Sequence, residues 1–97
     1  TKWKYFTDGK ALIEEAITAA PLNPEIRYIR LMVQLNAPAL VGYSSEIDED
    51  LKIFVQYIGD YAVDADWKTS FIKNLKTSDG ISATQIAQLT TVQTNIN

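Results

Sequence analysis

The chain contains neither cysteine nor histidine. The lack of cysteine excludes disulfide bonds, thiol catalysis and zinc sites built on thiolates. The lack of histidine removes the commonest general base and the commonest transition-metal ligand. A Ser-His-Asp or Cys-His catalytic arrangement is therefore impossible within these 97 residues.

Other features are scarce as well. The four glycines are isolated, so no glycine-rich phosphate loop is present. No apolar run reaches the roughly 18 residues that a membrane helix needs. The net charge is −3, the isoelectric point is about 4.7, and the nine lysines and arginines form no basic run. We therefore expect no nucleic-acid partner and no membrane span.

The length fits one domain, which we place at residues 1–97. The apolar fraction of 46% and the charged fraction of 22% are ordinary for a globular domain. Because the chain begins at Thr1 without methionine, we expect a processed protein or a part of a longer one. Both an exported or periplasmic and a cytoplasmic location remain open.

The hydrophobic pattern predicts an all-α fold with about five helices and no strand. The apolar spacing is three and four residues in each segment, which is typical of amphipathic helices. The expected helices cover residues 3–20, 24–36, 45–63, 65–76 and 83 to about 96.

Two helix starts carry strong local signals. Asn23 is a good N-cap and Pro24 fits the first helical position of the second helix. Ser82 and Gln85 match the capping-box pattern of the last helix. Weaker signals make Ser45 and Asp64 the expected caps of the third and fourth helices.

The second expected helix is apolar on most of its circumference, which predicts a central helix packed on several sides. One polar stripe interrupts this surface, formed by Asn23, Arg27, Arg30 and Gln34. An arginine on a nearly buried helix must be paired or must reach solvent.

The first two helices resemble a junction of the tetratricopeptide-repeat (TPR) family. The run that carries the resemblance is Gly9, Ile13, Ala16 and Pro21, followed by Asn23-Pro24. The later helices show no 34-residue copy of it. The resemblance implies a TPR-like right-handed helical array, with an irregular bundle as the alternative.

A second resemblance covers about residues 6–79. The stretch A-I-x-x-x-P-x-N-x-E-I-R-Y-I-R-L-M-V-Q-x-N-A-P, residues 16–38, is similar to a group of uncharacterised proteins from the Bacteroidetes. It continues through Gly42-Tyr43 and Glu46-Ile47-Asp48-x-Asp50. That group implies a helical fold and no particular activity.

The arginine stripe has two interpretations. In the structural one, the guanidinium groups bind internal carboxylates such as Glu14, Glu15 or Glu46, or the free carbonyls of a loop. In the functional one, they grip a small anionic ligand or the carboxylate of a partner. The candidate contact residues are Arg27, Arg30, Gln34, Tyr28 and Tyr43.

The acidic residues predict no metal site and no catalysis. The run at residues 46–50 lacks the ligand spacing of an EF-hand, and Asp64-Ala-Asp66 fails at Lys68. The carboxylate pair Glu46 and Asp50 is expected to face solvent, where burial cannot tune a pKa. We expect no cofactor, no metal and no enzyme activity.

The aromatic residues are expected mainly in the core, with Trp67 and Phe71 facing inward. Trp3 and Tyr5 are the exceptions, because they are placed to cover a neighbouring subunit. The favoured function is a non-catalytic protein- or peptide-interaction or scaffold module of TPR-like type, and a homo-oligomer is one assembly this allows. The alternative is a small anionic-ligand-binding or regulatory domain that uses the Arg27/Arg30 stripe.

Overall fold

A tight turn after Pro21 folds the first two helices into a hairpin. Helix α1 spans Lys2–Ala19 and helix α2 spans Pro24–Asn36 in the computed structural model. The Asn23 side chain caps α2 as predicted, because its Oδ1 accepts from the amides of Glu25 and Ile26 at 2.9 and 3.1 Å. The structure describes residues 2–37 and 42–96, with the backbone alone at residues 2 and 3.

Three further helices complete the described part of the chain, so the prediction of an all-α fold is confirmed. They are α3 (Ile47–Tyr57), α4 (Ala65–Lys76) and α5 (Ala83–Thr94). The Ser82–Gln85 capping box is formed in both directions. Gly42 takes a φ of +64°, a left-handed conformation that residues with a Cβ rarely adopt.

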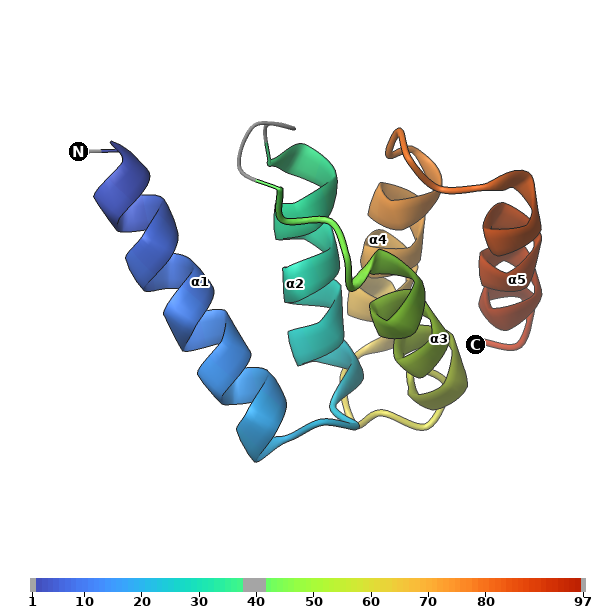
Figure 1. The fold of residues 1–97 in the computed structure, drawn as a ribbon. Helices are drawn as coiled ribbons and strands as arrows, with labels where there is room; N and C mark the ends of the chain where they lie inside the picture. Colours follow the sequence, from blue (N-terminus) through green and yellow to red (C-terminus); the bar gives the residue numbers. More distant parts are fainter. Residues whose placement is uncertain (1, 38–41, 97) are drawn as a thin grey trace.

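Helix α1 lies at one end of the row of helices and α5 at the other (Figure 1). The central core is built by α2 to α5 and contains Leu31, Leu51, Phe54, Ile58, Phe71, Ile72, Leu75 and Leu89. Among the described side chains, α1 contributes none to this cluster and packs chiefly on α2. The first helix is therefore peripheral, and a large part of its surface is exposed.

The third helix is shorter than predicted. It ends at Tyr57 instead of near residue 63, and Gly59 follows in a turn. Glycine is a poor helix former, and the Lys68 ammonium binds the Gly59 carbonyl at 2.7 Å. Neither Ser45 nor Asp64 makes the predicted cap: Glu46 holds the N-cap position of α3, and the Asp64 side chain makes no capping bond.

The prediction that Trp67 faces inward is wrong, since this residue is 58% exposed. The inward face of α4 is set by Phe71, Ile72 and Leu75, and Lys68 lies one turn before them on that face. Lys68, and not Trp67, is therefore the buried residue in this turn of α4, and its ammonium group stays hydrogen-bonded to the Gly59 carbonyl. Trp67 stays at the edge, with its ring centroid 6.1 Å from that of Phe71.

The prediction that α2 is packed on several sides is confirmed, because α2 contacts α1 and α3 and its Tyr28 stacks on Phe71 of α4, while Ile29 is half exposed. The predicted coverage of a neighbour by Trp3 concerns a side chain outside the described residues. The sequence of residues 38–43 is too short and too broken for a long helix and predicts at most one helical turn, and most of this segment lies outside the described residues.

Candidate functional site

The polar stripe of α2 is the buried side of that helix. Arg27, Arg30 and Gln34 are all at most about a twentieth exposed. They face Asp50 of α3, whose side chain is completely buried. Placing a carboxylate there costs free energy unless it is paired and hydrogen-bonded.

Arg30 supplies most of that pairing. Its Nε donates to Asp50 Oδ2 at 2.8 Å and its Nη2 to Asp50 Oδ1 at 2.6 Å, which is the two-pronged geometry of an arginine–carboxylate pair. Its remaining Nη1 donates to both carboxylate oxygens of Glu14 in α1, at 2.9 and 3.1 Å. The bond to Asp50, followed by the bond to Glu14, raises the pKa of Arg30 against the effect of burial. Arg30 thus joins α1, α2 and α3.

Arg27 and Gln34 saturate the rest of the Asp50 carboxylate. Arg27 Nη1 donates to Oδ1 at 2.9 Å and Gln34 Nε2 donates to Oδ2 at 2.8 Å, so each oxygen accepts two bonds. Arg27 Nε donates to the Pro21 carbonyl in the α1–α2 turn, and Gln34 Oε1 accepts from the Glu46 amide before α3. Among the described side chains, no buried polar atom lacks a partner.

Tyr43 completes the group through Glu14. Its hydroxyl donates to Glu14 Oε2 at 2.7 Å. Burial and then this bond to a carboxylate raise the pKa of Tyr43. Burial acts to raise the pKa of Glu14, but the hydrogen bonds from Tyr43 and Arg30 outweigh it, so the pKa lies below its ordinary value. We call the six residues of this network the Asp50 cluster: Glu14, Arg27, Arg30, Gln34, Tyr43 and Asp50.

The structure brings together four of the five residues predicted as a contact site. Arg27, Arg30, Gln34 and Tyr43 belong to the Asp50 cluster. Tyr28 lies elsewhere on α2, stacked on Phe71 with ring centroids 4.3 Å apart. Half a turn of helix separates it from the polar stripe.

The carboxylate partners were predicted in part. Glu14 binds Arg30 as predicted. Glu15 is exposed, and Glu46 takes part only through its backbone amide, which donates to Gln34 Oε1. The main partner, Asp50, was missed, and the prediction that it faces solvent is wrong. The signal was its register: Asp50 stands three residues after Ile47 and four before Phe54, on the apolar face of α3.

This geometry gives Arg27 and Arg30 a structural role, because they join helices of the same chain. Their hydrogen-bonding groups point at internal oxygens, and neither of the two described pockets is lined by Arg27 or Arg30. The arginine stripe was the observation behind the anionic-ligand hypothesis. With internal carboxylates as its partners, that hypothesis keeps no supporting observation.

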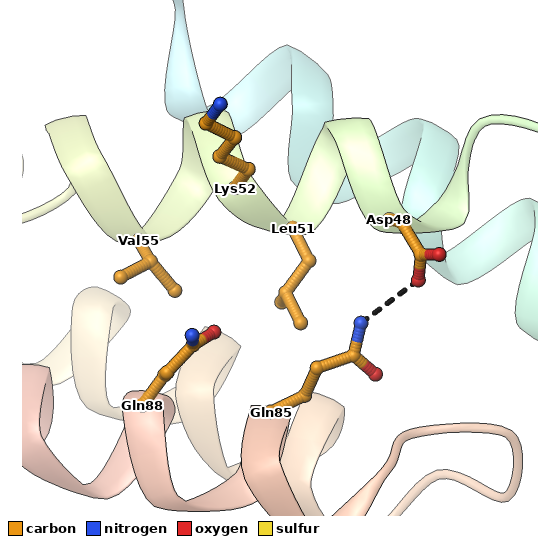
Figure 2. Close-up of a pocket in the computed structure, with 6 residues that line it drawn as sticks. All are labelled: Asp48, Leu51, Lys52, Val55, Gln85 and Gln88. Atoms are coloured by element: carbon orange, nitrogen blue, oxygen red, sulfur yellow. Dashed lines mark hydrogen bonds between the residues drawn. The ribbon is translucent and has the colours of Figure 1, made fainter.

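A groove of about 440 Å³ lies between α3 and α5 (Figure 2). Leu51 and Val55 project from α3 toward α5 and form its apolar floor. At one end, Gln85 Nε2 donates to Asp48 Oδ1 at 2.9 Å. The remaining lining residues are Lys52 and Gln88. The groove holds no convergent set of polar groups beyond this one bond.

A smaller hollow of about 250 Å³ lies at the start of α4, lined by Asp64, Asp66, Trp67 and Ser70. Its carboxylates stand at a helix N-terminus, where negative charge is favourable in itself. No group of three or more side chains suited to bind a metal ion occurs within residues 2–37 and 42–96.

Exposed apolar side chains gather on the α1–α2 hairpin. Four of the five large exposed hydrophobic residues in the described part of the chain lie there: Tyr5 at 74%, Leu12 at 67%, Leu22 at 52% and Ile29 at 46%. Trp67 is the fifth. A concentration of this kind marks a contact surface more often than scattered single residues do.

Three of these residues lie on one side of the hairpin, opposite the Asp50 cluster. Leu12 precedes Glu14 by two residues and Ile29 follows Arg27 by two, and two residues turn a helix by about 200°. Tyr5 precedes Leu12 by seven residues and so shares its side of α1. We call the surface made by Tyr5, Leu12 and Ile29 the hairpin face.

No helix in the described part of the chain is long and apolar enough to cross a membrane. Comparison with protein-family models, curated proteins and solved structures gave no match to this chain. Among the candidate sites, the hairpin face is an apolar surface that no other described part of the chain covers.

Proposed function

We propose that this chain is a non-catalytic interaction module of TPR-like type that binds another protein through the hairpin face. The observation that carries the proposal is the exposure of Tyr5 and Leu12, at 74% and 67%, on one side of α1. Burying a Leu side chain is worth about 1.5–3 kcal/mol, so such a pair supplies a useful part of a binding energy. Ile29 extends the apolar surface onto α2.

The position of α1 supports the same proposal. It lies at the end of the row of helices and rests on α2, so its other side has no neighbour within the described chain (Figure 1). In stacked helical hairpins each unit buries its apolar face against the next one. An exposed hairpin face at the end of a row is the surface on which a further helix packs.

The role is proposed as non-catalytic because the buried charged groups are engaged with one another. Asp50, Arg27 and Arg30 are bound within the Asp50 cluster, and Lys68 is bound to a backbone carbonyl. These groups hold helices together, and none of them lines either of the two described pockets. Enzymes, in contrast, place titratable groups with shifted pKa values in a cleft.

The proposal is tested by photocross-linking from defined positions. A benzoylphenylalanine is placed at Leu12 on the hairpin face, at Gln88 in the α3–α5 groove, or at Thr69, an exposed residue of α4. Extracts of cells that make the protein are irradiated, and products are separated by mass. We expect a discrete product from position 12 and none from position 69.

A second substitution shows whether the product depends on the hairpin face. Ile29→Lys, on the other helix of that face, is expected to abolish the product from position 12. Lys73→Glu, at an exposed residue of α4, is expected to leave it unchanged. Circular dichroism confirms that both variants are folded. A product from position 88 alone, or a position-12 product that survives Ile29→Lys, would overturn the proposal.

A further inference from the structure

Helix α1 lies outside the hydrophobic core of the bundle formed by α2 to α5. None of its described side chains belongs to the core cluster or packs against it. Ile17 is the one described side chain of α1 that is buried. The helix packs chiefly on α2, and the two helices diverge toward the N-terminal end of α1 (Figure 1). Most of the apolar burial that stabilises the fold therefore does not involve α1.

One side of α1 rests on Tyr43. The ring of Phe6 meets the Tyr43 ring edge to face, with centroids 6.0 Å apart, and Lys10 Nζ lies 4.6 Å from the Tyr43 centroid. The Tyr43 hydroxyl donates to Glu14 Oε2 at 2.7 Å. Phe6, Lys10 and Glu14 are four residues apart, which places them on the same side of the helix.

Glu14 also joins α1 to Arg30, whose Nη1 donates to both carboxylate oxygens at 2.9 and 3.1 Å. The side chain of Glu14 is 43% exposed, although that of Arg30 is buried. When α1 moves away, water replaces the partners of Glu14, so these hydrogen bonds are exchanged and not simply lost. The attachment of α1 is therefore weaker than the attachment of α2 to α3.

The pairing inside the bundle does not depend on α1. All four hydrogen bonds to the Asp50 carboxylate come from residues of α2, so none of them breaks when α1 leaves. Arg27 Nε donates to the Pro21 carbonyl at 2.9 Å and holds Pro21 on α2. Ala20 lies between the last residue of α1 and this fixed proline. A residue before proline is pushed away from helical geometry, which makes Ala20 the hinge.

We infer that α1 is a hinged arm, which leaves the α2–α5 bundle as one unit about Ala20 while the core stays folded. The hydrogen bonds of Glu14 to Arg30 and Tyr43 are the latch that holds it in place. The hairpin face contains residues of both α1 and α2, so release of the arm takes that surface apart. This inference concerns the chain alone and does not rest on the proposed function.

Amide hydrogen exchange tests whether the arm opens by itself. Exchange of the native chain is followed by NMR at neutral pH, in increasing urea below the unfolding transition. Helices in proteins are stabilised mainly by packing, so a released α1 exposes its amides. We expect the amides of Ile13 and Ile17 to share one protection factor, at least about tenfold below those of Phe54 and Leu75, and a weaker dependence on urea. Protection and urea dependence equal to those of Phe54 and Leu75 would overturn the inference. Protection that falls steadily along α1 toward its N-terminus would show fraying and overturn it too.

A substitution in the core separates local opening from global unfolding. Ile72 of α4 is completely buried, and its contacts persist when α1 alone is released. Ile72→Val is therefore expected to lower the protection of Phe54 and Leu75 at least about twofold and to leave that of Ile17 unchanged. An equal loss of protection at all three amides would show that α1 opens only when the whole chain unfolds.

The latch is tested at Glu14 itself. Glu14→Gln removes the charge that both donors bind, and we expect it to lower the protection of the α1 amides at least about threefold. Glu15→Gln, at the exposed neighbouring residue, is the matched control and is expected to change nothing. Circular dichroism confirms that both variants are folded. Unchanged protection in Glu14→Gln would show that Glu14 is not the latch. These experiments involve no partner, so their failure leaves the proposed function standing.

Discussion

Arg30 and Asp50 meet as a two-pronged pair, with Nε 2.8 Å from Oδ2 and Nη2 2.6 Å from Oδ1. Asp50 is completely buried and Arg30 nearly so. Two more donors, from Arg27 and Gln34, bind the same carboxylate. The pair fixes how α2 and α3 sit against each other, and the remaining Arg30 nitrogen carries that constraint to α1 through Glu14.

Removing the Asp50 carboxylate is expected to destabilise the fold severely. Asp50→Ala leaves two buried guanidinium groups without their shared counter-ion, and breaking a buried ion pair this way costs about 3–5 kcal/mol. Urea unfolding followed by circular dichroism measures the loss. Asp60→Ala, at an exposed carboxylate, is the matched control and is expected to change stability by no more than about 0.5 kcal/mol. Equal effects of the two substitutions would contradict the assigned role of Asp50.

Glu14 is expected to make stability depend on pH in the acid range. Because its folded pKa lies below the ordinary value of 4.5, its stabilising contribution is complete above that pH. As the pH falls below 4.5 toward the lowered pKa, the unfolded chain binds the proton first and the contribution is lost. The difference in unfolding free energy between the native chain and Glu14→Gln should therefore shrink over this range. A difference that stays constant from pH 6 to pH 3 would refute the assignment.

Gly9→Ala is expected to stabilise the monomer. The added methyl group meets no atom within 4 Å, and alanine is a better helix residue than glycine by about 1 kcal/mol. The gain should be seen in urea unfolding at micromolar concentration. A loss of stability would mean that Gly9 is needed for packing inside the chain.

Leu12→Lys is expected to leave the fold intact. The side chain is 67% exposed, so its replacement should change the unfolding free energy by no more than about 0.5 kcal/mol. Leu89→Ala, at a fully buried leucine of α5, should cost about 2–5 kcal/mol in the same assay. If Leu12→Lys destabilised the chain as much as Leu89→Ala, the hairpin face would be a part of the core.

The sequence predicted best where the signal is local. Asn23-Pro24 and the Ser82–Gln85 box begin helices by bonds within four residues, and both starts are observed. The end of α3 and the inward face of α4 are joined by a hydrogen bond from the Lys68 ammonium to the Gly59 carbonyl, nine residues apart. Such a contact follows from the packing of two helices and leaves no trace in the local pattern.

The sequence predicted the arginines of the candidate site but not their main carboxylate partner, Asp50. The buried stripe of Arg27, Arg30 and Gln34 was recognised because a nearly apolar helix carried it. Asp50 was assigned to solvent with its acidic neighbours, although its register on α3 matches the core residues Leu51 and Phe54. An acidic residue in line with the apolar face of one helix, opposite arginines on another, is the pattern that identifies such a pair.

We propose that this protein is contacted at the hairpin face, and neither at the arginine stripe nor in the α3–α5 groove. The most direct test is an amide NMR titration with the molecule captured at position 12, whether a second copy or another protein. We expect the chemical-shift changes to concentrate at Tyr5, Leu12 and Ile29. Changes centred on Arg27 and Arg30, or on Val55 and Gln88, would contradict it.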